Sequence, residues 1–104
     1  MKFGLKEEII HKINNIFLQY SAVEEAILYG SRAKGNFKKG SDIDIVLKGA
    51  KLNLSELHNI MIEIDDLSLP YSVDISLLHT INNPDLLDHI RRRGVVFYTA
   101  ENVE

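Results

Sequence analysis

The chain has 104 residues, a hydrophobic content of 45%, a formal net charge of −3 and no cysteine. This size and composition predict a single small globular domain over residues 1–104. The negative charge argues against broad nucleic-acid binding driven by phosphate neutralisation, so we expect no DNA partner. The absence of cysteine excludes disulfides and thiolate metal sites and fits a cytoplasmic protein. The N-terminal sequence MKFGLKEEII lacks the apolar run of a signal peptide or a membrane span, so we expect no membrane partner.

The first half of the chain predicts a helix, a short strand and a tight turn. Apolar residues recur at helical spacing over Leu5–Gln19, which predicts an amphipathic helix. Glu25–Tyr29 reads as a strand that ends at Gly30. Ser31 can then cap a short helix whose first backbone N–H groups face an anion.

The second half continues the alternation of strands and helices. Ser41–Lys48 predicts a strand, and Leu54–Leu67 predicts a helix that is capped by Asn53 or Ser55. Pro70 ends this helix, and Tyr71–Leu78 predicts the third strand.

The last elements complete an α/β (α+β) pattern. Pro84 favours the start of a helix that runs to Arg93, Gly94 is placed to end it, and Val95–Tyr98 predicts a last short strand. This order predicts a single small mixed sheet with helices packed on one face. The free face would carry the carboxylates described next.

Residues 30–44 read GSRAKGNFKKGSDID, a Gly-Ser pair followed by Asp42-x-Asp44. Because successive strand side chains alternate between faces, Asp42 and Asp44 are expected on one face, about 6–7 Å apart. Carboxylates at that distance repel one another unless a cation or hydrogen bonds neutralise them. Magnesium is usually held by one or two carboxylates together with substrate phosphates. The pattern therefore indicates phosphoryl or nucleotidyl transfer.

Other phosphate and metal motifs do not fit these residues. An EF-hand loop that starts at Asp42 needs Gly and Glu where the chain has Leu47 and Asn53. The glycines of Gly35–Gly40 have the spacing of a P-loop, but Ser41 follows where the motif needs lysine. The dinucleotide motif G-x-G-x-x-G is absent.

A third carboxylate lies in the next predicted strand. Asp74 would share a face with Ser76, while Val73, Ile75 and Leu77 point to the apolar face. An isolated Asp in an apolar strand is disfavoured and needs a reason. If the two strands are neighbours, Asp74 completes a three-carboxylate cluster around one or two metal ions.

With these residues in order, the chain resembles the minimal nucleotidyltransferases (MNT proteins) of the DNA polymerase beta superfamily. The resemblance implies a polymerase-beta-like palm and a single nucleotidyltransferase domain. It implies that Gly30 and Ser31 bind the nucleotide, and that Asp42 and Asp44 bind nucleotide and magnesium and take part in catalysis. Asp74 would be the third catalytic carboxylate, either as a metal ligand or as a base. Two Mg²⁺ ions would be the cofactor and ATP the substrate.

The resemblance also implies a protein partner. MNT proteins commonly pair with a helical HEPN-domain protein as antitoxin and toxin, in a hetero-oligomer. The chain has no arginine followed by histidine at the R-x4–6-H spacing of HEPN ribonucleases, which makes it the antitoxin half. It would transfer AMP to a tyrosine of the toxin, with RNA a less favoured acceptor. The alternative is a non-catalytic nucleotide-binding subunit that neutralises its partner by contact.

The remaining charged and aromatic residues favour structural interpretations. The four histidines show no metal-ligand spacing and are interpreted as structural or surface residues; they are His11, His58, His79 and His89. Arg91, Arg92 and Arg93 lie in the last turn of a predicted helix, where cations complement the negative end of the dipole.

Overall fold

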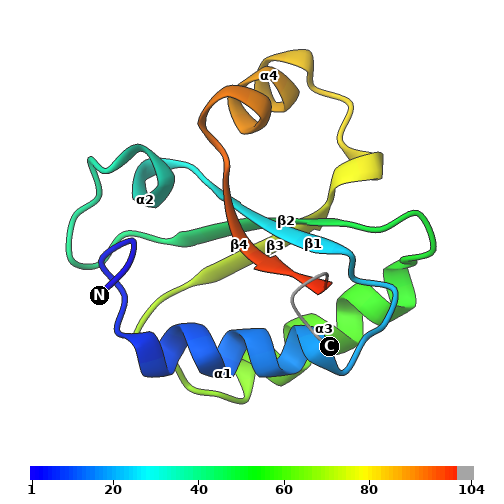
Figure 1. The fold of residues 1–104 in the computed structure, drawn as a ribbon, viewed down its shortest axis with the longest axis horizontal. Helices are drawn as coiled ribbons and strands as arrows, with labels where there is room; N and C mark the ends of the chain where they lie inside the picture. The colour runs from blue at the N-terminus through cyan, green and yellow to red at the C-terminus, as the bar shows by residue number, and fades with distance from the viewer. Residues whose placement is uncertain (101–104) are drawn as a thin grey trace.

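A four-stranded mixed sheet forms the centre of the computed structural model, which describes residues 1–100 (Figure 1). The strand order is β3-β2-β1-β4; β1 is antiparallel to β2 and β4, and β2 is parallel to β3. The strands are β1 (Glu25–Tyr29), β2 (Ile43–Lys48), β3 (Val73–Leu77) and β4 (Val95–Thr99). The mixed α/β fold expected from the sequence is confirmed. Residues 101–104, which the sequence analysis included in the domain, lie outside the described part.

The two long helices cover one face of the sheet. Helix α1 (Glu7–Leu18) and helix α3 (Leu54–Asp65) lie side by side beneath it (Figure 1). Strands β1 and β2 turn their alternate apolar residues to these helices, and the shared core is buried. Its largest fully buried side chains include Phe17, Leu28, Ile43, Ile45, Leu47 and Ile60.

The other face of the sheet is partly covered, which refines the expectation that it is free of helices. Helix α2 (Ser31–Lys34) and helix α4 (Pro84–Arg93) both lie on that side, and η1 (Leu78–Thr80) leads into α4 (Figure 1). Val46 belongs to this face by strand alternation and is fully buried outside the main core cluster, and Ile90 of α4 is buried as well. The carboxylate face therefore has an apolar part beneath α4 and a polar part beside it.

Asparagine side chains cap the N-terminal ends of α3 and α4. The Asn53 side chain accepts a hydrogen bond from the backbone N–H of Glu56 and caps α3, which decides between the two expected caps. The Asn83 side chain accepts from Asp85 and Leu86 and caps α4. These contacts satisfy N–H groups that have no partner within the helix.

Several element boundaries differ from the sequence prediction by one or two residues. Strand β3 spans Val73–Leu77 rather than Tyr71–Leu78, α3 ends at Asp65 rather than Leu67, and β4 ends at Thr99 rather than Tyr98. Helix α1 begins at Glu7 rather than Leu5, because Phe3 and Gly4 have positive φ and form a turn in which Leu5 bonds back to Lys2. Strand β2 begins at Ile43 rather than Ser41. Among residues 1–100, no helix is long and apolar enough to span a membrane.

Candidate active site

Three polar side chains form a row across one end of strands β1, β2 and β3. Tyr29 at the end of β1 pairs with Asp44 of β2, and Asp44 pairs with Asp74 of β3. Directly paired residues project from the same face of a sheet, so the three side chains lie on the face opposite the main core. The expected neighbourhood of Asp44 and Asp74 is therefore present, because β2 and β3 are adjacent and in parallel register.

The electrostatics of Asp44 reflect this crowding. Burial raises the pKa of Asp44, and the negative charges of Asp74 and Asp42 raise it further. Each effect disfavours the ionised form, because a carboxylate loses water and gains like-charged neighbours. The three carboxylates thus interact electrostatically, and a bound cation would relieve their repulsion.

Asp42 differs from the prediction in one respect, since it lies just ahead of strand β2 and not within it. The carbonyl of Ser41 is held by the Arg32 side chain, and the ladder to β3 starts with Ile43 bonding to Ser72. In the described chain, no three His, Asp or Glu side chains are grouped closely enough to hold a metal ion. Asp44 and Asp74 are thus aligned by the strands, while Asp42 is placed by the preceding loop.

The Gly-Ser turn adjoins Asp44 directly. Gly30 has φ +79° and ψ −156°, a conformation that is essentially restricted to glycine. A Cβ atom at Gly30 would lie 2.5 Å from an Asp44 carboxylate oxygen. Glycine is therefore required at this position for two reasons: the backbone conformation and the close approach of the Asp44 carboxylate.

Ser31 is the first residue of α2 and not its cap. Gly30 occupies the N-cap position, and no side chain caps the helix. The turn that follows is ordered by Ser41, whose hydroxyl accepts a hydrogen bond from the backbone N–H of Lys38. Lys38 and Lys39 are exposed on this connection.

Arg32, whose role was not predicted from the sequence, is 2% exposed. Its guanidinium donates to the backbone carbonyls of Ser41, Phe3 and Lys39 at 2.8–3.4 Å. It also lies over the rings of Phe37 and Tyr71, 5.3 and 4.7 Å from their centroids. Arg32 therefore joins the N-terminal turn, α2 and the loop that delivers Asp42. No local pattern signals this, because the partner carbonyls are up to 29 residues away.

A second unanticipated pair flanks the Gly-Ser turn. His89 of α4 accepts a hydrogen bond from the Gly30 N–H through Nε2, at 3.2 Å. Its ring meets Tyr29 edge-on, with 6.2 Å between centroids. Burial raises the pKa of Tyr29, as do the charges of Asp74 and Asp44, while a hydrogen bond with Ser76 opposes the shift. Tyr29 is thus a protonated phenol beside the carboxylates at neutral pH.

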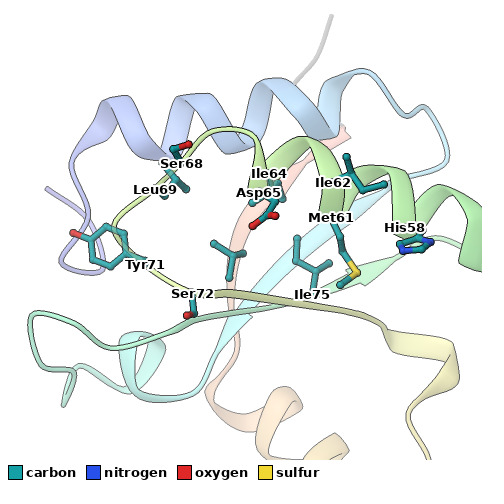
Figure 2. Close-up of a pocket in the computed structure, with 11 residues that line it drawn as sticks. His58, Met61, Ile62, Ile64, Asp65, Ser68, Leu69, Tyr71, Ser72 and Ile75 are labelled. Atoms are coloured by element: carbon teal, nitrogen blue, oxygen red, sulfur yellow. The ribbon is translucent and has the colours of Figure 1, made fainter.

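One cavity of the structure lies apart from these residues. It measures about 490 Å³ and is bordered by α3 and β3, with Met61, Ile64 and Ile75 among its lining (Figure 2). Neither Gly30 nor any of the three Asp side chains lines it. Asp42 and Asp74 are exposed, whereas Asp44 and Tyr29 are half-buried.

The family of the chain follows from its similarity to known proteins. A family model, "Polymerase beta, Nucleotidyltransferase", matches residues 11–102. The chain belongs to the polymerase beta nucleotidyltransferase family. A comparison with curated protein sequences finds no match.

Solved structures with the same fold include toxin–antitoxin complexes. A toxin–antitoxin structure with AMP-PNP matches with TM-score 0.69 and 21% identity, over 93% of this chain and 76% of that chain. A tri-AMPylated HEPN toxin in complex with an MNT antitoxin, from Shewanella oneidensis, matches with TM-score 0.67 and 17% identity, over 93% and 75%. A candidate nucleotidyltransferase from Sulfolobus solfataricus matches with TM-score 0.54 and 18% identity, over 98% and 92%. At these identities the likeness establishes the shared fold.

The donor chemistry of the site fits magnesium. The aligned groups are carboxylate oxygens, the hard ligands that Mg²⁺ prefers. The raised pKa of Asp44 shows that its neighbours are close enough to oppose its charge. Asp44 and Asp74 are the carboxylates that the strands bring together, so they would hold such an ion, and Asp42 would join them from the preceding loop.

Proposed function

We propose that the chain is a magnesium-dependent nucleotidyltransferase that moves AMP from ATP onto a hydroxyl acceptor. The observation that carries this proposal is the contact between Gly30 and Asp44, combined with the register that pairs Asp44 with Asp74. A glycine turn packed on a carboxylate pair places a phosphate-binding backbone beside metal-binding oxygens. Membership of the nucleotidyltransferase family supports the same reaction class.

In the proposed reaction, the acceptor hydroxyl oxygen forms a bond to the α-phosphorus of ATP. The bond from that phosphorus to the bridging oxygen breaks, and pyrophosphate leaves. Gly30 and Ser31 would hold the triphosphate, and Asp42, Asp44 and Asp74 would hold two magnesium ions. When bound, such ions stabilise the attacking and leaving oxygens of an in-line displacement. Asp74 is an edge-strand carboxylate and serves either as a ligand or as the base that takes the hydroxyl proton.

We further propose a HEPN-type protein as partner and acceptor, within a toxin–antitoxin pair. Structural neighbours support this, because several are MNT–HEPN complexes and one holds an AMPylated toxin. The exposure of Asp42 and Asp74 supports it as well, because exposed carboxylates can meet a side chain of another protein. A tyrosine of the partner is the acceptor, and modification silences the toxin. We place this reaction in the cytoplasm.

Intact-mass analysis of the partner tests the proposal. The tagged chain is expressed in its source cell, and the co-purified partner is analysed after isolation with wild type or Asp42→Asn/Asp44→Asn. We expect AMP on a partner tyrosine with wild type and none with the double variant. A matched control, Asp65→Asn/Asp66→Asn, removes the same charge from the end of α3, away from the site, and should leave modification intact.

The same experiment distinguishes the alternative function. A non-catalytic subunit that neutralises its partner by contact would co-purify with an unmodified partner. It would also protect cells from the partner equally well as wild type and as Asp42→Asn/Asp44→Asn. That pair of results would replace nucleotidyl transfer with contact inhibition.

A further inference from the structure

We propose that His89 is a positioning residue for the nucleotide, because it holds the backbone of the Gly-Ser turn in its binding shape. The inference rests on the proposed function and adds a residue from α4, an element outside the motif. His89 is not proposed to touch the nucleotide. It would act through the Gly30 N–H, which its Nε2 accepts at 3.2 Å.

The imidazole is fixed from two sides. Nε2 is the ring nitrogen that accepts from Gly30, the role of the acceptor nitrogen of an imidazole. The ring edge packs on Tyr29 with an interplanar angle of 78°. Tyr29 and Gly30 are consecutive residues, and Tyr29 pairs with Asp44. One side chain of α4 therefore contacts both residues that lead into Ser31.

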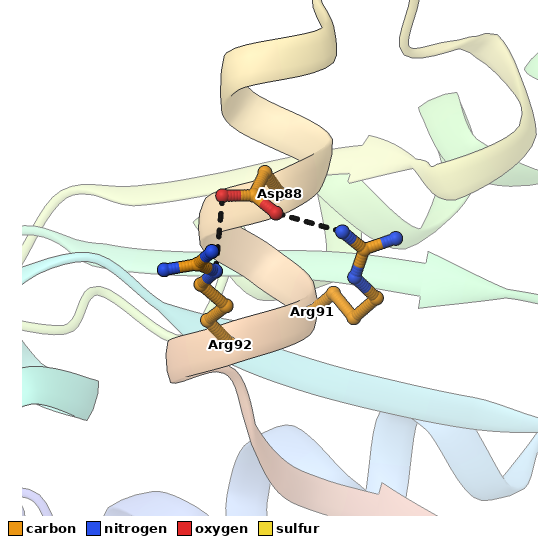
Figure 3. A network of polar contacts seen from close by, with 3 residues as sticks. All are labelled: Asp88, Arg91 and Arg92. Atoms are coloured by element: carbon orange, nitrogen blue, oxygen red, sulfur yellow. Dashed lines mark hydrogen bonds and ion pairs between the residues drawn. The ribbon is translucent and has the colours of Figure 1, made fainter.

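Helix α4 is a firm support for this contact. Its start is capped by Asn83, and Ile90, next to His89, is 5% exposed. The opposite, outward side carries ion pairs from Asp88 to Arg91 and Arg92 (Figure 3). The inward side of α4 thus bears the buried residue and the histidine, while the charged residues face solvent.

The turn needs an acceptor because of its unusual backbone. Gly30 combines φ +79° with ψ −156°, and such conformations persist only when the surroundings hold them. A half-buried N–H without a partner also costs free energy. Without His89, the Gly30 peptide can rotate toward water, and the Ser31 amide would move with it. Nucleotide binding would then include the cost of restoring the turn.

A matched pair of variants tests the acceptor. His89→Gln keeps an acceptor at a similar reach, and His89→Met has a similar length with only a thioether sulfur, a weak acceptor. Binding of a non-hydrolysable ATP analogue with Mg²⁺ is measured by calorimetry. We expect His89→Met to weaken binding about three- to tenfold, the effect of one hydrogen bond, and His89→Gln to restore most of it. The control Asp88→Asn, on the outward side, should bind like wild type.

A second readout does not depend on nucleotide. Amide hydrogen exchange of Gly30 is measured by NMR in the free proteins. Exchange should be slow in wild type and His89→Gln and faster in His89→Met, with the core amides of β1 unchanged.

If wild type binds no nucleotide, the proposed function fails, and the Gly30 exchange still tests the contact. Fast Gly30 exchange in wild type would overturn the inference, as would equal nucleotide affinity of the Met and Gln variants. Should His89→Met not fold, the wild-type exchange and His89→Gln decide.

Discussion

At the scale of single residues, Asp44 sits where a carboxylate is unfavourable for folding. Burial and the charges of Asp74 and Asp42 raise its pKa above the ordinary value of 3.8. In the pH interval above 3.8, the folded state therefore binds more protons at Asp44 than the unfolded state does. Folding stability from this group falls as the pH rises through that interval.

Asp44→Asn should consequently raise the melting temperature at neutral pH while removing nucleotidyl transfer. The change removes a charge that the fold opposes, at nearly constant volume. Thermal unfolding followed by circular dichroism at a series of pH values measures this. The gain should vanish below pH 3.8, where Asp44 is protonated in both states. A variant that is less stable than wild type at pH 7 would contradict the assignment of repulsion.

Arg32 presents the opposite case, a buried charge that the fold needs. Arg32→Met would keep the stem but leave the carbonyls of Ser41 and Phe3 without their donor. We expect a loss of about 2–3 kcal/mol in the free energy of unfolding, measured by urea denaturation. Arg91→Met, at an exposed arginine of α4, should change stability by less than about 0.5 kcal/mol. Similar losses in both variants would refute the special role of Arg32.

Alanine substitutions at Gly30 and Gly35, which have similar φ, distinguish the effect of backbone strain from the effect of the contact with Asp44. Alanine at Gly35, φ +86°, meets no atom within 4 Å, so Gly35→Ala should cost about 1 kcal/mol of stability and leave nucleotide binding intact. Alanine at Gly30 adds the collision with the Asp44 carboxylate. Gly30→Ala should therefore abolish binding in calorimetry as well as destabilise the fold. Equal nucleotide affinity of the two variants would show that the turn does not form the site.

At the scale of elements, the two asparagine caps provide a comparison between α3 and α4. Asn53→Ala and Asn83→Ala should each cost about 1 kcal/mol of stability, because each removes a helix cap. Only α4 carries His89 to the Gly-Ser turn. Asn83→Ala should therefore also weaken nucleotide binding, measured by calorimetry, whereas Asn53→Ala should not. Equal affinities would mean that α4 does not support the turn.

The elements that the sequence predicted well are those encoded by local patterns. Period-two alternation placed Asp44 and Asp74 on one face, and the helical stripe of α1 identified its buried side. The roles of Arg32 and His89 could not be predicted, because their partners come from distant segments. Arg32 bonds to Phe3, 29 residues away, and His89 to Gly30, 59 residues away. The boundary of β2 moved for the same reason, since Arg32 holds Ser41 outside the ladder.

At the scale of the whole molecule, the fold divides its two sheet faces between stability and chemistry. The face that α1 and α3 cover holds the main core. The opposite face presents the carboxylate row beside α4. Asp42 and Asp74 are exposed on this face, and Asp44 is half-buried between them and the Gly-Ser turn. The cavity bordered by α3 and β3 lies apart from this row.

Label transfer from ATP tests the central claim most directly. The purified chain, magnesium and lysate from its source are incubated in parallel with ATP labelled at the α- or the γ-phosphate. Nucleotidyl transfer predicts an acceptor labelled from α-labelled ATP but not from γ-labelled ATP, and no label with Asp42→Asn/Asp44→Asn. Label from the γ-position alone would mean phosphoryl transfer, and α-label that persists in the double variant would place the chemistry outside this site. Either result would contradict the account.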